Sequence, residues 1–376
     1  MHHAPEWPSP NGDLYNTRAA HTTIAAASVS KLGIAWTLPL KGDGSNGADV
    51  ANPVLAAGIA YVQDGASNVM AVRYATGAVL WTHRYNSPDY EPNGVTIGNG
   101  QIYGVTATGA FALDAGTGRQ LWYDTHLAAR AASFHIAPQV AGGKVFVSSV
   151  LTVGGGILYA LDANTGATIW RFQTVADKIG QQLPSTAGGA WDPFLIGPDH
   201  SIYAGIGNPY LSQYQAQTTP SRELYTDSIV KLDQATGKLE WYYQAFPDDF
   251  HDWDLQISPI YTAAGGHPVV LAAGKGGFVF AFNPMSGKLP QMPLGGATVS
   301  NDLVFTTTLT GNATLLTSKV VALSRKDGSI VWTAHLPAGS NATLAIVGNM
   351  LLAGAALAAP NQHPVVVAYR LGAKMP

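Results

Sequence analysis

Short runs of β-branched and aromatic residues alternate with turn sequences along most of the chain. Residues 101–106 and 144–149 are such runs, and each is followed by a second run, at 111–114 and 158–162. Runs of this length and composition are typical of β-strands. No stretch shows the 3.6-residue period of an amphipathic helix. The pattern therefore predicts an all-β protein.

A repeated phrase, Ala-Leu-Asp-Ala-x-Thr-Gly-x-x-x-Trp, occupies residues 112–122 and again 160–170. Its Asp can accept hydrogen bonds from the backbone just ahead, and its Gly tolerates a positive φ, so the phrase predicts a turn into a further strand that ends in Trp. The Gly-to-Trp spacing recurs in three degenerate copies, and one more copy has Gln in place of Trp. These copies are Gly77 with Trp81, Gly237 with Trp241, Gly328 with Trp332, and Gly287 with Gln291.

Successive repeats lie roughly 40 to 50 residues apart, with one longer interval, and this is the length of a four-stranded propeller blade. Residues 31–40, with Trp36, look like an outer strand without inner strands before it, whereas the C-terminal region offers inner strands without an outer one. Pairing the two ends would close the ring. We expect one β-propeller domain over residues 1–376, with an N-terminal extension over 1–30. It should have seven blades, or eight if a degenerate unit lies in the longest interval.

Composition narrows the classes of partner. Charged residues make up 11% of the chain and the net charge is −3, with no basic face, so nucleic acid is not expected as a partner. The chain has no Cys, which excludes disulfides, thiolate metal sites and a Cys-x-x-Cys-His haem motif. The first residues contain no apolar signal core. The apolar stretch 344–359 is shorter than a membrane span and is broken by Gly, so no span is expected.

The tryptophans outside the repeat mark where the pattern is interrupted. Six of the nine occupy repeat positions, and Trp7, Trp191 and Trp253 do not. Trp191 lies in the longest interval, for which we expect an insertion over residues 178–228. An acidic segment, 248–259, follows Trp241 in a chain that is otherwise poor in charge. Buried charges need a partner or a cation, although a loop of this kind can also be solvated.

These segments carry a resemblance to a known family. The repeat, followed in order by GlyAsnProTyr (207–210), LeuTyrThrAspSer (224–228), TrpTyrTyrGln (241–244), HisAspTrpAsp (251–254) and AlaGlyLysGlyGlyPheValPheAla (273–281), resembles the pyrroloquinoline quinone (PQQ) dehydrogenases. Residues 7–18 resemble the N-terminal segment of the same superfamily, that of the quinoprotein alcohol dehydrogenases. The resemblance covers nearly the whole chain. It implies an extracytoplasmic location, periplasmic or secreted.

The resemblance assigns roles to particular residues. Trp191 matches the family's Trp that stacks against the flat quinone, and Asn208 matches its calcium ligand. Asp254 matches the general base, which also approaches the metal, and Asp252 is the second choice for the base. Lys275 matches a cation beside the quinone oxygens. Bound calcium would polarise a quinone carbonyl as a Lewis acid.

The chain also departs from the family pattern. The third calcium ligand of the family is a Glu, but residues 148–158 contain no acid. Asn93 stands where the family usually has a cofactor-binding Arg. The additional Asp that is associated with lanthanide use is replaced by Gln256. The loss of a carboxylate removes both charge and geometry from an oxygen-ligand site, so calcium is the weakest part of the assignment.

Three functions remain open from the sequence. The first is a PQQ-dependent dehydrogenase that oxidises an alcohol or similar small substrate and passes electrons to an external acceptor. The second is a propeller without cofactor that acts as a protein-interaction scaffold. The third is a different enzyme on the same fold, similar to tetrathionate hydrolases. Each site residue also has a purely structural interpretation: Trp191 as core, Asn208 as a turn residue before Pro, and the acids as a hydrogen-bonded loop. Their joint order favours the dehydrogenase.

Overall fold

A computed structural model describes the chain between Glu6 and Leu371, with gaps. The residues outside the description are 1–5, 21, 23, 25, 27, 41–52, 90–93, 128–132, 151–154, 176–186, 211–223, 265, 289–297, 301, 313–314, 327, 339, 341–344, 348, 356–364 and 372–376. The chain divides into two compact units, Met1–Ile260 and Tyr261–Pro376, and each is described by itself. The expectation of one domain over 1–376 therefore stays a prediction.

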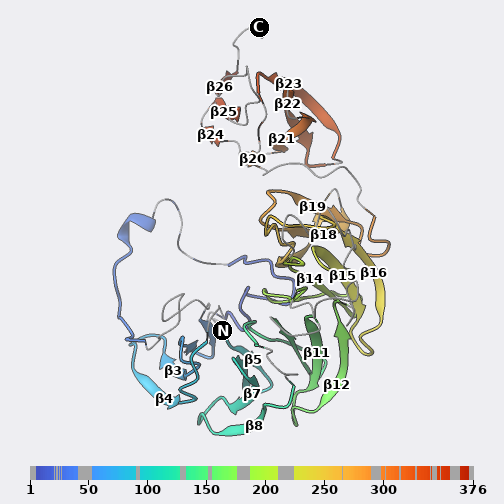
Figure 1. The fold of residues 1–376 in the computed structure, drawn as a ribbon. Helices are drawn as coiled ribbons and strands as arrows, with labels where there is room; N and C mark the ends of the chain where they lie inside the picture. Colours follow the sequence, from blue (N-terminus) through green and yellow to red (C-terminus); the bar gives the residue numbers. More distant parts are fainter. Residues whose placement is uncertain are drawn as a thin grey trace. The chain divides into compact units, whose positions relative to one another are not determined.

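The sheets of the first unit are antiparallel meanders in which strands that follow each other in sequence are hydrogen-bonded neighbours (Figure 1). Four sheets of four strands each are present. Their strands are β1 (Val54–Ala56), β2 (Ile59–Gln63), β3 (Val69–Arg73) and β4 (Val79–His83); β5 (Thr96–Gly98), β6 (Gln101–Thr106), β7 (Gly109–Asp114) and β8 (Gln120–Asp124); β9 (Gln139–Ala141), β10 (Lys144–Ser149), β11 (Ile157–Asp162) and β12 (Thr168–Gln173); and β13 (Leu195–Ile196), β14 (Ser201–Gly205), β15 (Ser228–Asp233) and β16 (Leu239–Gln244).

The second unit continues the same pattern, and its first sheet begins with a strand that crosses the boundary between the units. The sheets are β17 (Ile257–Ala264), β18 (His267–Ala273) and β19 (Val279–Phe282); β20 (Thr298–Ser300), β21 (Leu303–Asn312), β22 (Leu315–Ser324) and β23 (Ile330–Leu336); and β24 (Ala345–Val347), β25 (Met350–Ala355) and β26 (Val365–Arg370). The described residues thus form seven sheets, in agreement with the seven predicted blades. Gln291, in the copy without Trp, lies outside the described residues.

The repeated phrase forms the turn between the third and fourth strands of a blade, as predicted. Asp114 Oδ1 accepts hydrogen bonds from Thr117 N at 2.8 Å and from Thr117 Oγ1 at 2.7 Å, and Gly118 has φ of +72°. The side-chain and backbone hydrogen bonds from Thr117 lower the pKa of Asp114. Asp162 with Thr165, and Asp233 with Thr236, make the same pair of bonds. A carboxylate cap followed by a left-handed Gly therefore reverses the chain in these three blades.

Four of the repeat Trp residues dock on the same turn of the next blade. Trp81 donates from Nε1 to Ala115 O at 3.0 Å, and its ring lies so close to Gly118 that a Cβ there would be 2.6 Å from it. The same latch joins Trp36 to Tyr74 O and Gly77, Trp122 to Ala163 O and Gly166, and Trp170 to Gln234 O and Gly237. The repeat thus encodes a contact between blades, which is why its Gly and Trp recur together.

The N-terminal end of the predicted ring behaves only partly as expected. Residues 32–40 are not assigned to a strand, and Lys31 ends a short 3-10 helix, η1 (Val29–Lys31). Trp36 nevertheless makes the latch of an outer strand, and with Leu38 and Leu40 it packs on Val62 and its neighbours. The strand that would pair with this segment, β26, belongs to the other unit. Closure of the ring stays a prediction.

The longest interval between repeats contains part of a blade. The segment 178–228, expected as an insertion, includes β13 and β14, the two inner strands of the fourth sheet, between long connections. The core of unit 1 runs through the third and fourth sheets, where Phe146, Phe194 and Ile202 are fully or almost fully buried. No helix in the described part of the chain has the length and hydropathy needed to cross a bilayer.

Candidate functional site

The connections that leave the blades at one end bring three of the predicted site residues together. In a four-stranded meander, the connection between strands two and three and the connection to the next blade emerge at the same end. Asn208 follows β14 in the first kind of connection, whereas Trp191 precedes β13 and Asp254 precedes β17 in the second kind. The blade order therefore gathers residues that are up to 63 positions apart in sequence (191 to 254).

Asn208 is the centre of this group. Its backbone N–H donates to Asp254 Oδ1 at 2.7 Å, and its side-chain Nδ2 donates to Asp252 Oδ1 at 2.8 Å. Asn208 is 4% exposed, and its Oδ1 atom is buried without a hydrogen-bond partner. A buried, unpaired amide oxygen beside a carboxylate costs free energy unless another group satisfies it. The sequence predictions for Asn208, Asp252 and Asp254 thus converge on one place.

Trp191 reaches the same group through a glycine that leaves room for it. A Cβ on Gly207 would lie 2.8 Å from Asp254 Oδ1 and 3.2 Å from both Trp191 Nε1 and Gly189 O. The backbone on both sides is pinned, because Gly207 N donates to Gly189 O at 2.9 Å and Ala190 N donates to Ser148 Oγ at 3.1 Å. The absence of a side chain at 207 therefore lets the indole edge approach the Asp254 carboxylate.

The N-terminal segment supports the backbone next to the site. Asn11 Nδ2 donates to Ser258 Oγ at 2.9 Å, and Asn16 Nδ2 donates to Pro259 O at 2.8 Å, four and five residues beyond Asp254. Both asparagines are buried. The family-like segment 7–18 thus has a structural role within unit 1 and fixes the start of β17.

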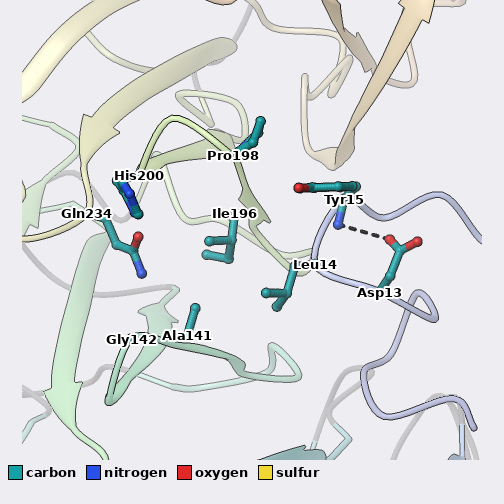
Figure 2. A pocket seen from close by; sticks show the side chains of 10 residues that line it. Asp13, Leu14, Tyr15, Ala141, Gly142, Ile196, Pro198, His200 and Gln234 are labelled. Carbon is teal, nitrogen blue, oxygen red and sulfur yellow. Dashed lines mark hydrogen bonds between the residues drawn. The ribbon is translucent and has the colours of Figure 1, made fainter.

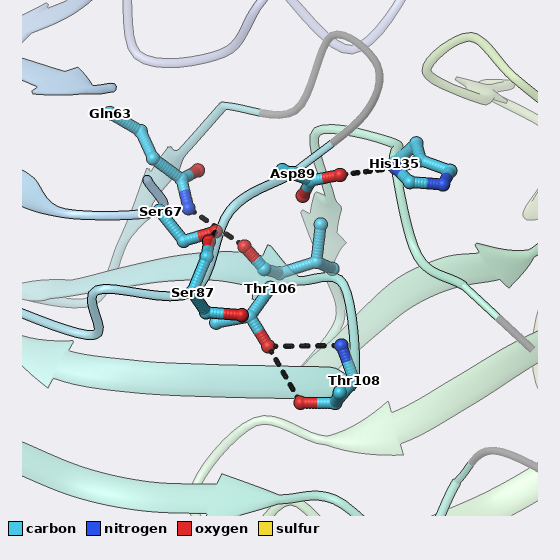
Figure 3. A network of polar contacts seen from close by, with 8 residues as sticks. Gln63, Ser67, Ser87, Asp89, Thr106, Thr108 and His135 are labelled. Atoms are coloured by element: carbon cyan, nitrogen blue, oxygen red, sulfur yellow. Dashed lines mark hydrogen bonds and ion pairs between the residues drawn. The ribbon is translucent and has the colours of Figure 1, made fainter. Parts of the chain in front are cut away.

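A buried Asp–His pair, which the sequence did not indicate, adjoins Trp191. His135 Nδ1 is hydrogen-bonded to Asp89 Oδ1, and the two side chains are 2% and 1% exposed (Figure 3). The imidazole is stacked on the Trp191 indole, with ring centroids 5.9 Å apart and an angle of 3° between the planes. In the sequence, only one feature could have pointed to this pair. Both residues lie in connections that lead into the first strand of a blade, as Trp191 does, so all three lie at the same end of the blades.

Asp227 is a second residue that sequence reasoning overlooked, although it lies within the motif 224–228. It is fully buried, and neither side-chain oxygen has a hydrogen-bond partner of regular geometry. Burial and then the nearby carboxylates Asp249, Asp254 and Asp252 together raise its pKa to about 9, against an opposing effect of the Leu255 N–H. Asp227 is therefore a neutral acid at neutral pH in this arrangement.

The acidic segment is partly explained by local structure. Asp249 accepts hydrogen bonds from the backbone N–H groups of His251 and Trp253, each at 2.8 Å, which makes it a loop-capping residue. Among the described residues, no group of three or more His, Cys, Asp or Glu has the arrangement of a metal site. A cation at this place would therefore depend on Asn208 Oδ1 and Asp254 rather than on an acidic cage.

Two predicted cofactor residues are not brought to this group by the structure. Lys275 is exposed in the turn between β18 and β19, in the second unit, whose placement relative to Trp191 is not described. Asn93 lies outside the described residues. So do residues 151–154, which are part of the stretch 148–158 where the family has its Glu. The roles of Lys275 and Asn93 remain predictions.

A separate hollow lies at the other end of the blades (Figure 2). It has a volume of about 550 Å³ and is bounded by the β9–β10 and β13–β14 turns, with Leu14 and Tyr15 of the N-terminal segment at one side. Its side chains are mostly apolar and include no pair of catalytic groups. The chemistry-bearing residues therefore lie elsewhere, around Asn208.

The group around Asn208 fits a cation and a flat ligand in part. Asn208 Oδ1 and Asp254 offer two oxygen ligands of the kind that calcium prefers. The half-buried Trp191 offers an aromatic surface, and Gly207, which has no side chain, lets the indole edge lie near Asp254. A buried carboxylate next to such a surface can accept a proton from a bound hydroxyl group.

Comparison with known proteins agrees with the blade pattern. Residues 129–293 match the PQQ family described as glucose/ethanol/alcohol dehydrogenase, beta-propeller domain. The chain is 30% identical, over 327 residues, to the quinohemoprotein alcohol dehydrogenase of Comamonas testosteroni, covering 76% of this chain and 46% of that protein. It is 32% identical, over 306 residues, to the quinohemoprotein alcohol dehydrogenase ADH IIB of Pseudomonas putida, covering 71% and 44%.

Solved structures show the same fold. The quinohemoprotein alcohol dehydrogenase ADHIIG of Pseudomonas putida HK5 superimposes with a TM-score of 0.72 at 20% identity, over 97% of this chain and 71% of that one. A europium-containing methanol dehydrogenase gives 0.68 at 18% identity, over 93% of this chain and 82% of that one. The chain spans less than half the length of the two curated relatives, so their complete activities do not transfer to it directly.

Proposed function

The chain belongs to the PQQ-type β-propellers of the quinoprotein alcohol dehydrogenase-like superfamily, and on this basis we propose that it is a PQQ-dependent dehydrogenase of an alcohol or similar small substrate. One observation carries the proposal. Asn208, with a buried amide oxygen that lacks a partner, lies between the Asp254 and Asp252 carboxylates and close to Trp191. A scaffold has no need for such a group.

In this proposal Asp254 is the base that takes the proton of the substrate hydroxyl. Its Oδ1 accepts the Asn208 N–H at 2.7 Å, and the side chain is 2% exposed, so burial keeps its orientation fixed. Asp252 accepts from the Asn208 side chain and is exposed to solvent. The buried carboxylate is the better base, because a protein environment enhances proton transfer where water is excluded.

The cofactors enter the proposal through the residues that would hold them. Asn208 Oδ1 and Asp254 would bind calcium, and Trp191 would stack against PQQ. Bound PQQ would supply the two-electron acceptor and calcium the Lewis acid. Trp191 orients the flat ligand, Gly207 lets the indole edge lie near Asp254, and Asp254 receives the proton. Lys275 and Asn93 stay candidates for contacts with the anionic rim of PQQ.

We also propose an external electron acceptor and an extracytoplasmic location. Residues 1–376 contain no Cys and hence no c-type haem site, so the proposed acceptor lies outside these residues. The location follows only from the family resemblance and from the PQQ requirement of the proposed activity. Fractionation of the native host, with an antibody to this chain, tests it: recovery with the cytoplasmic marker would contradict it.

The test of the function is reconstitution of the purified protein with PQQ and calcium. We expect quinone absorbance to co-elute with the protein, a higher melting temperature, and reduction of a dye by an alcohol. Asp254→Asn should retain PQQ and lose turnover, whereas the exposed Asp302→Asn should behave as the unmodified protein. If Asp252→Asn loses turnover and Asp254→Asn does not, the base has been assigned to the wrong residue. No binding at micromolar PQQ would refute the proposal.

A further inference from the structure

The Asp89–His135 pair is tied into a chain of contacts that ends at Trp191. Asp89 N donates to Gly65 O at 2.9 Å, and Ser67 Oγ donates to Ser87 O at 2.8 Å, so the Asp89 loop is pinned to the β2–β3 connection (Figure 3). Asp89 in turn holds His135 Nδ1, and the imidazole lies parallel to the Trp191 indole. The chain of contacts thus connects blade one with the site residue of blade four.

The burial of the two rings differs, and this indicates which side of Trp191 is covered. His135 is 2% exposed, whereas Trp191 is half-buried. Rings at a 5.9 Å centroid distance and a 3° angle form an offset stack. The imidazole therefore covers part of the indole from the protein side, and the accessible part of the indole remains for a ligand.

We propose that Asp89 and His135 are positioning residues that hold the Trp191 indole as a flat bed for the cofactor. This inference rests on the proposed function. Asp89 fixes the ring plane of His135 through Nδ1, and the His135 ring fixes the plane of Trp191 by stacking. Gly207 borders the Nε1 edge of the indole and so limits how far the ring can shift within its own plane.

A purely space-filling role explains the pair less well. Taking a carboxylate and an imidazole out of water is costly, and apolar side chains of similar volume stabilise a core as well or better. A flat ring whose plane is locked by a hydrogen bond offers what an aliphatic side chain does not, namely a defined orientation for the ring stacked on it. Stacking energy falls when two planar systems tilt, so a fixed indole plane favours a flat ligand.

The first test needs no cofactor. In spectra of the ¹⁵N-labelled protein, the Trp191 indole N–H signal is identified as the one of nine that is lost in Trp191→Phe. We expect His135→Ala and His135→Gln to shift or broaden this signal, because the indole loses a stacked ring. The exposed His126→Gln should leave it in place. An unchanged Trp191 signal in both His135 variants would overturn the inference.

The second test measures the dissociation constant of PQQ by titration calorimetry, without substrate. We expect a weakening of roughly 3- to 10-fold for His135→Ala and His135→Gln, the scale of one lost aromatic pair. The double variant Asp89→Leu with His135→Phe restores a flat ring without leaving a buried carboxylate unpaired, and it should bind within about threefold of the unmodified protein.

The outcomes separate this inference from the proposed function. If the unmodified protein binds no PQQ, the proposed function fails, and the indole signal alone decides whether the pair positions Trp191. If the unmodified protein binds PQQ and both His135 variants bind it equally well, the proposed function stands and the positioning role is wrong. Melting temperatures of all variants, compared with that of His126→Gln, identify any variant that does not fold. If His135→Ala does not fold, His135→Gln, whose side chain is close to His in volume, provides the test.

Discussion

Replacement of Asp227 by Asn should stabilise the protein at neutral pH. The buried carboxyl has a pKa of about 9 instead of 3.8, because of burial and then of the neighbouring carboxylates Asp249, Asp254 and Asp252. Between these two values the folded protein keeps a proton that the unfolded chain releases. The folded state therefore binds more protons, and the free energy of unfolding falls as pH rises from about 4 to about 9.

The size of the effect follows from the shift. Each pH unit in this window lowers the free energy of unfolding by about 1.4 kcal/mol. Between the unfolded pKa of 3.8 and pH 7, the loss is therefore at most about 4 kcal/mol. Asn is neutral at every pH and similar in size to a protonated Asp. Asp227→Asn should therefore raise the free energy of unfolding by about 2–4 kcal/mol at pH 7 and leave it unchanged near pH 4.

Urea denaturation at pH 4, 5, 6, 7 and 8 in the presence of a chelator measures this difference. Asp233→Asn is the matched control, because the side-chain and backbone hydrogen bonds of Thr236 lower the pKa of Asp233. Its stabilising contribution is present above the unfolded value and disappears as pH falls, so this variant should be less stable than the parent at pH 7. If Asp227→Asn gains nothing at pH 7, or its gain does not depend on pH, Asp227 is ionised in the folded protein and the reasoning is wrong.

Two further substitutions test the fold. Gly118→Ala would place a Cβ 2.6 Å from Trp81 at a φ of +72°, and we expect the free energy of unfolding in chemical denaturation to fall by about 2–5 kcal/mol. The control is Gly58→Ala, at a φ of +76° with no atom within 4 Å, which should lower it by only about 1–2 kcal/mol. Equal losses would refute the inter-blade latch. Lys231 Nζ contacts Asp199 at 2.9 Å and Glu240 at 2.8 Å and is 3% exposed, so Lys231→Met should cost about 1–3 kcal/mol at pH 7. Against the effect of burial, Lys231 lowers the pKa of Asp199, so the cost in urea denaturation should shrink as pH falls through the titration of Asp199. A cost that does not depend on pH would assign the effect to packing.

The sequence was sufficient for the blades because their signal is local. Asp114, Thr117 and Gly118 form a turn within five residues, and Trp122 follows at a fixed distance, so the repeat records both the turn and the Trp that latches to the next blade. The outer strand expected over 31–40 was not found as a strand. Such a strand exists only when a partner lies beside it, and a local pattern does not report the partner.

The sequence predicted only those residues of the candidate site that belong to the family motifs. Asn208, Asp254 and Trp191 were named from motifs, and the structure brings them together. Asp89 and His135 are 46 residues apart and belong to no motif, so their hydrogen bond became visible only with the fold. Asp227 stood inside a quoted motif but was given no role, because its unusual property arises from burial near three other acids.

The free energy lost by burying the Asp227 carboxyl and the unpaired Asn208 amide oxygen favours a functional site over a scaffold. A fold that needed only to present blades could place Asn or Ser at 227 and leave no amide oxygen buried without a partner at Asn208, and it would be more stable for both changes. The latches between blades, by contrast, satisfy the indole N–H groups of Trp81, Trp122 and Trp170 and pack each ring against a glycine. Groups that cost stability and gather at one place are typical of residues kept for binding or catalysis. The substitution that we expect to stabilise the protein at Asp227 therefore also tests the place where we propose that the chemistry occurs.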